Sequence, residues 1–188
     1  MYRAKHVTQS NGVDCRLAVG CVHLDHLTRG KVTCTPDEMR AHIPQGKRGR
    51  LDADDLRRAW EFGHGETLVI RNGKYWSKLL EDRGLGRFIE LDLWYGYPHT
   101  VGIAPETSRG RWLVYDPLKG SWEWQDYAEL RSAAGEWGRR ILRMPPQPAR
   151  ATETPVTGPS GTGAHPTVHG GVGDENFGPI YYTTAVRK

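Results

Sequence analysis

This sequence of 188 residues contains no long apolar run. A membrane-spanning helix needs about 20 consecutive apolar residues, whereas only 37% of these residues are hydrophobic and the mean hydropathy is -0.64. The first residues, MYRAKHVTQSNG, carry some positive charge but lead into no apolar segment. We therefore expect no membrane partner and no secretory signal peptide. The expected location is the cytoplasm or a phage particle.

Cysteine is scarce as well. Cys15, Cys21 and Cys34 are too few, and odd in number, for a disulfide framework, which indicates a reducing compartment or a functional thiol. Two histidines, His23 and His26, lie between them and raise the question of a zinc site. The segment contains no C-x-x-C pair, and position 21 shares no helix face with positions 23 and 26. We therefore expect no metal site and interpret Cys21 and Cys34 as core residues.

No charge of one sign dominates the chain. The sequence has 26 basic and 22 acidic residues, and the two kinds are interleaved. The most basic stretch, residues 47–50, is followed at once by Asp52, Asp54 and Asp55, which would weaken its attraction to phosphate. The charge pattern therefore does not indicate a nucleic-acid partner.

The composition changes after residue 144. All seven tryptophans precede this point, whereas residues 145–188 hold seven of the 12 prolines and seven of the 23 glycines. Such a segment cannot bury enough apolar surface to offset its ordering entropy. We predict a domain at residues 1–144 and an extended arm at 145–188. The end of the arm, Phe177 to Val186, is β-prone, so it could add a strand to a partner or fold back onto its own domain.

Helical patterns come first in the domain and strand patterns later, which predicts an α+β fold. A capping threonine, Thr35, and a proline at the first helical position open the second helix. A turn is expected at Asn72-Gly73. The predicted helices are Cys15–Leu27, Thr35–His42, Asp52–Phe62, Tyr75–Asp82 and Asp126–Ala134, and the predicted strands are Thr67–Ile70, Arg87–Trp94, His99–Ala104, Arg111–Asp116 and Arg139–Leu142.

His99 and Asp116 lie symmetrically about a turn expected within Glu106 to Gly110. If residue 104 pairs with 111 in an antiparallel hairpin, then His99 pairs with Asp116, with their Cβ atoms about 5 Å apart on one face. A carboxylate in this position orients an imidazole and stabilises its protonated form. The nearby aromatic residues Trp94, Tyr95 and Tyr97 could line a cleft beside His99 or could serve packing alone.

The group that this pair would activate is Cys15, which follows Asp14 and opens the first predicted helix. A helix N-terminus and a protonated histidine can lower a thiol pKa from ~8.5 to roughly 3.5–7.5, which gives a nucleophilic thiolate at neutral pH. Gln9 precedes Cys15 by six residues. Its side-chain amide could stabilise an oxyanion together with the backbone N–H of Cys15.

These segments resemble the papain-like cysteine peptidases, in particular the branch related to bacteriocin-processing, double-glycine leader peptidases. The segment from Gln9 to Cys15 resembles the oxyanion glutamine and nucleophile of that family, Pro98 to Val101 its histidine strand, and Val114 to Gly120 its Asp-Pro-x-x-Gly segment. The resemblance covers about residues 7–144. It implies an N-terminal helical half packed on a C-terminal antiparallel sheet, an active cleft between them, and no cofactor. Arg16 stands where that branch usually has a small residue, so it could crowd the cleft or reset substrate preference.

The predicted function is therefore a cysteine hydrolase that cleaves amide bonds in a peptide or in a peptidoglycan peptide. Cys15 is the predicted nucleophile, His99 the base, Asp116 its orienting carboxylate and Gln9 the oxyanion donor. The resemblance leaves a cell-wall amidase open as well, although that class usually lacks the Asp-Pro-x-x-Gly segment.

The alternative is a structural or interaction protein with the same fold and a vestigial or single-use triad. Its arm, residues 145–188, would bind a protein partner in a phage particle or another assembly. Arginine outnumbers lysine by 19 to seven, which is typical of a GC-rich genome such as that of a bacterium or its phage.

Overall fold

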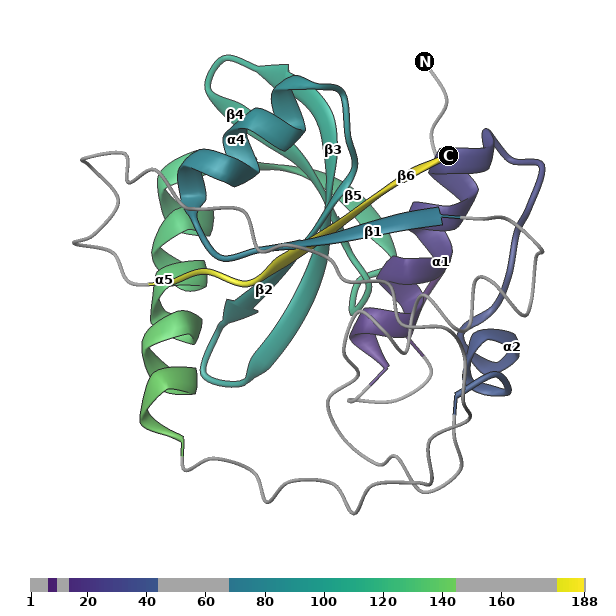
Figure 1. Ribbon diagram of the computed structural model, residues 1–188, viewed down its shortest axis with the longest axis horizontal. Coiled ribbons are helices and arrows are strands. Elements are labelled where there is room, and N and C mark those ends of the chain that lie inside the picture. The colour runs from purple at the N-terminus through teal and green to yellow at the C-terminus, as the bar shows by residue number, and fades with distance from the viewer. Residues whose placement is uncertain (1–6, 10–13, 44–67, 145–178, 188) are drawn as a thin grey trace, which may run out of the picture.

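The computed structural model describes residues 7–9, 14–43, 68–144 and 179–187. These segments build one six-stranded antiparallel sheet of order β1-β6-β2-β3-β4-β5 with helices on both faces (Figure 1). None of the helices in these segments has the length and apolar character needed to cross a bilayer. The helices are α1 (Cys15–Thr28), α2 (Pro36–Arg40), α4 (Trp76–Gly84) and α5 (Tyr127–Arg143), and the strands are β1 (Leu68–Gly73), β2 (Ile89–Trp94), β3 (Pro98–Ser108), β4 (Arg111–Asp116), β5 (Ser121–Asp126) and β6 (Tyr182–Arg187).

The sheet separates two layers of helices. Helix α1 lies against β2 and β3 on one face, and α5 lies against β2 and β5 on the other (Figure 1). Period-two alternation in β2 directs Leu91 and Leu93 into the apolar core that α4 and α5 cover. The same alternation directs Glu90 and Asp92 toward α1, where both are buried. The predicted α+β class with an antiparallel sheet is confirmed.

The first two helices begin where the sequence predicts. Helix α1 starts at Cys15, and the capping box of α2 forms as expected, since Thr35 Oγ1 accepts from Glu38 N at 3.2 Å and Glu38 Oε2 accepts from Thr35 N at 2.7 Å. The predicted helix at Asp52–Phe62 lies outside the described residues.

The predicted strand at Arg139–Leu142 is wrong, because these residues form the last turns of α5. The apolar positions Leu130, Ala133, Ala134 and Trp137 recur at helical spacing and bury one face of the helix, so the helix continues beyond Ala134. Strand β5, to which the sequence analysis assigns no element, forms along β4 and alternates Trp122 and Trp124 with polar residues.

The C-terminal segment folds back onto its own sheet. Strand β6 lies between β1 and β2, so residues 182–187 belong to the same sheet as the residues before 144 (Figure 1). The turn expected at Asn72-Gly73 is wrong because both residues continue β1 and pair with Thr183 and Tyr182. Gly73 is required there, since a Cβ would lie 1.8 Å from the ring of Tyr182.

The hairpin of β3 and β4 forms with a different register from the one predicted. Arg109 and Gly110 make its tight turn with φ of 49° and 74°, and Ser108 pairs with Arg111. Between the pairs Thr107↔Trp112 and Ile103↔Val114, β3 has three residues and β4 only one. This bulge means that Val101, not His99, continues the register opposite Asp116.

Candidate active site

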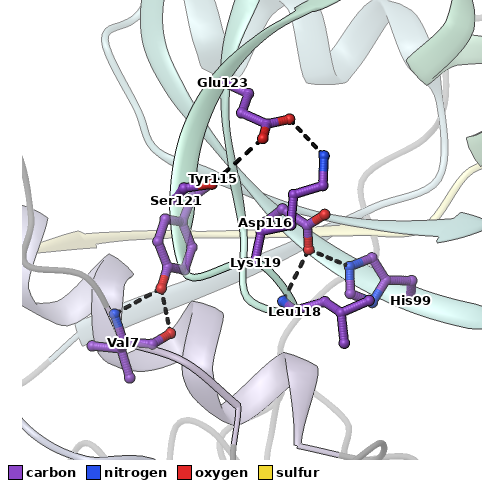
Figure 2. Close-up of polar contacts among 8 residues, drawn as sticks. All are labelled: Val7, His99, Tyr115, Asp116, Leu118, Lys119, Ser121 and Glu123. Atoms are coloured by element: carbon purple, nitrogen blue, oxygen red, sulfur yellow. Dashed lines mark hydrogen bonds and ion pairs between the residues drawn. The ribbon is translucent and has the colours of Figure 1, made fainter.

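The shift in register leaves His99 and Asp116 in contact. It moves the pairing by two residues, and two residues are one full period of a strand, so both side chains stay on one face as diagonal neighbours. His99 Nε2 lies 2.9 Å from Asp116 Oδ1 (Figure 2). Asp116 Oδ1 also accepts from the backbone N–H of Leu118 at 3.0 Å. The carboxylate is thereby fixed from two sides and holds the imidazole in one orientation.

The turn after Asp116 explains the Asp-Pro-x-x-Gly pattern. The backbone N–H of Gly120 donates to the Asp116 carbonyl at 2.8 Å and closes the turn. Gly120 has a φ of 63°, in the left-handed region, and a Cβ there would lie 2.5 Å from Thr8 Oγ1. Glycine therefore allows both the turn and the close approach of the N-terminal segment.

Gln9 is held against this turn by its backbone, since its N–H donates to the Pro117 carbonyl at 3.1 Å. Two residues earlier, the N–H of Val7 donates to the Tyr115 hydroxyl at 2.7 Å, and that hydroxyl donates to the Val7 carbonyl (Figure 2). These contacts bring Gln9 to the residue that follows Asp116. The segment between Gln9 and Asp14 lies outside the described residues.

Cys15 is the first residue of α1 and meets the start of β3, where it interacts with His99 and Thr100. Burial alone would raise the pKa of the Cys15 thiol, but the hydrogen bond to His99 and the charge of its imidazolium lower it below the ordinary value. Burial alone would lower the pKa of His99, but its hydrogen bonds to Asp116 and Cys15 raise it to about 9. The two shifts run in the directions that favour a thiolate beside an imidazolium.

The pKa of Asp116 moves in the direction that this state requires. Burial would raise it, but the hydrogen bonds from His99 and from the Leu118 N–H lower it below its usual range. A carboxylate therefore faces the imidazolium at any pH near neutral. The predicted contact between Cys15, His99 and Asp116 is present, and Gln9 lies beside the turn of Asp116.

Arg16 does not crowd the approach to Cys15. Its guanidinium turns under the sheet and forms a buried ion pair with Asp92 of β2, and it lies 3.5 Å from Thr183 Oγ1 of β6. Burial would lower the pKa of Arg16, but the charges of Asp92 and Glu90 raise it. Of the two possibilities raised by Arg16, the structure argues against crowding, because the side chain has a charged partner in the interior.

Thr100 links this ion pair to Cys15. Thr100 Oγ1 donates to Asp92 Oδ1 at 2.9 Å, and the backbone N–H of Thr100 hydrogen-bonds the Cys15 sulfur. Arg16, Asp92 and Thr100 thus connect the ion pair to the sulfur. The sequence pattern alone does not predict this chain of contacts. Its only signal is the presence of two acids, Glu90 and Asp92, at alternate positions of an otherwise apolar strand.

A buried ion pair also holds the residue before the nucleophile. Asp14 is fully buried and its carboxylate pairs with Arg40 of α2. This contact ties the start of α1 to the second helix. Nothing in the spacing of Asp14 and Arg40 in the sequence could predict it.

The two tyrosines near His99 have different surroundings from the neighbouring tryptophan. Tyr95 and Tyr97 are 43% and 47% exposed, and their ring centroids lie 6.4 Å and 5.8 Å from that of His99. They therefore offer an accessible aromatic rim beside the imidazole. Trp94 instead stacks on Trp137 of α5 at 5.8 Å, with Arg140 over its face. The packing reading therefore holds for Trp94, whereas a cleft lined by Tyr95 and Tyr97 stays a prediction.

Among the residues that the structure describes, no group of three or more histidines, cysteines or acids could hold a metal ion. The chemistry available at Cys15 is that of an activated thiolate with a proton donor beside it. Such a pair can attack an electrophilic carbonyl and return a proton to the leaving group.

No family model matches the chain. No curated protein matches it in sequence. Nine chains of solved structures do match it in fold, among them the peptidase domain of Streptococcus ComA, a bi-functional ABC transporter involved in a quorum-sensing pathway. The two are 18% identical with a TM-score of 0.55, and the match covers 71% of this chain and 92% of that domain. The chain thus has the fold of a peptidase domain, and the expected papain-like α+β fold is confirmed.

Proposed function

We propose that the protein is a cysteine peptidase in which Cys15 is the nucleophile. The observation that carries the proposal is the contact of Cys15 with His99, whose Nε2 lies 2.9 Å from Asp116 Oδ1. The fold shared with the ComA peptidase domain supports an amide substrate in a peptide. The peptide of a peptidoglycan cross-link has the same reacting bond.

In the first half of the reaction, the Cys15 thiolate attacks the carbonyl carbon and the carbonyl oxygen takes the electron pair. The Cys15 backbone N–H and the Gln9 side-chain amide would stabilise this oxyanion. His99 then donates its proton to the amide nitrogen, the C–N bond breaks, and the amine leaves. The product is a thioester between Cys15 and the acyl half of the substrate.

In the second half, His99 is neutral and accepts a proton from a water molecule. The resulting hydroxide adds to the thioester carbonyl, and collapse of the tetrahedral intermediate expels the Cys15 thiolate. The proton remains on His99, so the thiolate–imidazolium pair is restored. Asp116 keeps the same ring orientation through both proton transfers.

The test is digestion of a peptide library of known sequences, with new amino termini identified by mass spectrometry. We expect the unmodified chain to cut a set of related bonds, and Cys15→Ala and His99→Ala to lose this activity by at least ~10²-fold. Cys34→Ala and His42→Ala are matched controls of the same residue types outside the triad, and they should retain cutting.

The proposal fails if cutting persists in Cys15→Ala, or if the unmodified chain cuts no peptide and forms no thioester. In the second case the binding protein with a vestigial triad becomes the better account. Its C-terminal strand would then act inside its own sheet, since β6 already pairs with β1 and β2.

A further inference from the structure

The two cysteines that the proposed reaction does not use lie against each other. Cys21 is on α1 and Cys34 lies just before α2, and their Sγ atoms are 3.0 Å apart. Both are free thiols in this structure. A disulfide bond requires an S–S separation of about 2.05 Å, so the two sulfurs need to move together by only about 1 Å.

The pair is reachable from solvent on one side. A cavity of about 500 Å³ is lined by both cysteines, together with Thr8, Asp25 and Glu38. Cys34 is 9% exposed, whereas Cys21 is 1% exposed. A small oxidant that enters this cavity therefore meets Cys34 first.

We propose that Cys21 and Cys34 form a redox-active dithiol that a small disulfide such as oxidised glutathione converts to an intramolecular disulfide. The Cys34 thiolate attacks one sulfur of oxidised glutathione and releases one glutathione thiolate. Cys21 then gives up its proton and attacks Cys34 Sγ, which expels the second glutathione thiolate. Two protein thiols are oxidised, one glutathione disulfide is reduced to two glutathione molecules, and both protons end on glutathione.

The environment of Cys21 agrees with this order of events. Its hydrogen bond with Cys34 and its burial raise the pKa of the Cys21 thiol, which makes it a poor first nucleophile. It reacts second because Cys34 then stands beside it as part of a mixed disulfide.

The cross-link would join α1 to the segment that leads into α2. The two positions are 13 residues apart, so the bond would close a short loop and remove entropy from the unfolded chain. Helix α2 carries Arg40, which pairs with Asp14 beside Cys15. The proposed bond therefore acts on the same part of the fold that positions the start of α1, although it does not depend on the proposed peptidase activity.

The test uses the full chain with Cys15→Ala, so that only the pair can react. The protein is equilibrated in glutathione buffers from reducing to oxidising, its free thiols are alkylated in denaturant, and its mass is measured. We expect a monomer that is two hydrogens lighter, accepts no alkyl group, and yields a peptide joining Cys21 to Cys34. Its thermal midpoint should rise by on the order of 5–10 °C, and dithiothreitol should reverse the rise.

Cys34→Ala in the same background is the control, and it should show neither the mass loss nor the rise in midpoint. Comparison of the oxidised and reduced forms of one chain needs no further substitution, so a poorly folding control does not affect the result. The proposal is overturned if both thiols remain open to alkylation in the oxidising buffer. Stable glutathione adducts or a disulfide between two chains would overturn it as well.

Discussion

Folding changes which member of the Cys15–His99 pair binds a proton more readily. The pKa of Cys15 is lowered and that of His99 is raised to about 9, which favours a proton on the imidazole over one on the thiol. In an unfolded chain between pH ~6.5 and ~8.5 the thiol holds the proton instead. Wherever the folded pair is a thiolate and an imidazolium, both states bind one proton and the pair contributes almost no slope to stability against pH.

Removal of the Cys15 thiol should expose a pH dependence of the unfolding free energy that the intact pair cancels. In Cys15→Ala, His99 still faces Asp116 at 2.9 Å, and this hydrogen bond acts to keep its pKa above the unfolded value. Its stabilising contribution is then complete below pH ~6.5 and is lost as the pH rises through the folded pKa. We expect urea unfolding of Cys15→Ala to show stability that falls with pH above ~6.5 relative to the unmodified chain. Parallel curves for the two chains would contradict the ionised pair.

The ion pair of Arg16 and Asp92 should show strong coupling. The two side chains are 8% and 5% exposed, so Asp92→Asn leaves a buried guanidinium without its carboxylate. We expect this change to cost about 3–5 kcal/mol of unfolding free energy, and Arg16→Met with Asp92→Leu together to cost less than the sum of the two single changes. Urea unfolding of the parent chain, Arg16→Met, Asp92→Leu and the double variant measures the coupling, and Asp92→Asn is measured beside them. If each single change lowers the unfolding free energy by less than about 0.5 kcal/mol and the two losses add, the ion pair does not contribute to stability.

The sequence predicts the residues of the candidate site better than the residues that hold them in place. Cys15, His99 and Asp116 each carry a local signal, namely a helix start, a strand start and an Asp-Pro turn. Arg40 carries none, and Asp92 carries only its place, with Glu90, at alternate positions of an otherwise apolar strand. Their partners lie far away in sequence, and an arginine or aspartate is by default a surface residue.

At the scale of elements, the contact between α5 and the approach to β6 depends on one glycine. Gly138 lies within α5, and a Cβ there would be 1.5 Å from the Pro179 carbonyl oxygen. Because backbone cannot move aside as a side chain can, Gly138→Ala must push the segment before β6 away from the helix. Glycine costs roughly 0.5–1 kcal/mol in a helix relative to alanine, so the close approach explains its presence.

We therefore expect Gly138→Ala to destabilise the protein despite its better helix propensity. Gly84→Ala is the matched control, since Gly84 also lies in a helix and a Cβ there meets nothing within 4 Å. That change should be neutral or slightly stabilising. Thermal unfolding of both variants checks the prediction, and a Gly138→Ala chain as stable as Gly84→Ala would contradict the close packing.

The errors at this scale share a physical cause. The sequence places β3 and β4 correctly but misses the bulge, because no local signal counts residues across a pair of strands. The contact of His99 with Asp116 is still predicted because the shift of two residues keeps both on one face. The strand expected at Arg139–Leu142 fails because β-branched content over four residues is weaker than an apolar stripe that runs the length of α5.

At the scale of the whole molecule, the C-terminal strand β6 completes the sheet. Strand β6 lies between β1 and β2, and Tyr182, Thr183, Thr184 and Ala185 are buried there. The Tyr182 hydroxyl also donates to Asp82 of α4 at 2.7 Å. The β-prone end of residues 145–188 leaves open a strand added to a partner or a return to its own domain, and the structure shows the return. Local composition cannot choose between the two because the pairing is long-range.

Deletion of residues 179–188 should therefore abolish cooperative folding rather than only partner binding. It removes the partner with which β1 pairs and exposes the apolar residues that contact Ile180 and Tyr182. We expect loss of the near-ultraviolet circular dichroism signal and of a sharp thermal transition. A synthetic peptide of residues 179–188 added in trans should restore part of both. A truncated chain that melts like the full one would contradict the central place of β6.

The most direct measurement on the central claim is the alkylation rate of each cysteine by iodoacetamide against pH, resolved by peptide mass spectrometry. Cys21 and Cys34 serve as internal controls in the same chain, and His99→Ala and Asp116→Asn as comparisons. We expect Cys15 to react faster than Cys21 and Cys34 below pH ~7, and His99→Ala to abolish this difference. A Cys15 that titrates as an ordinary thiol near ~8.5, with or without His99, would contradict an activated nucleophile.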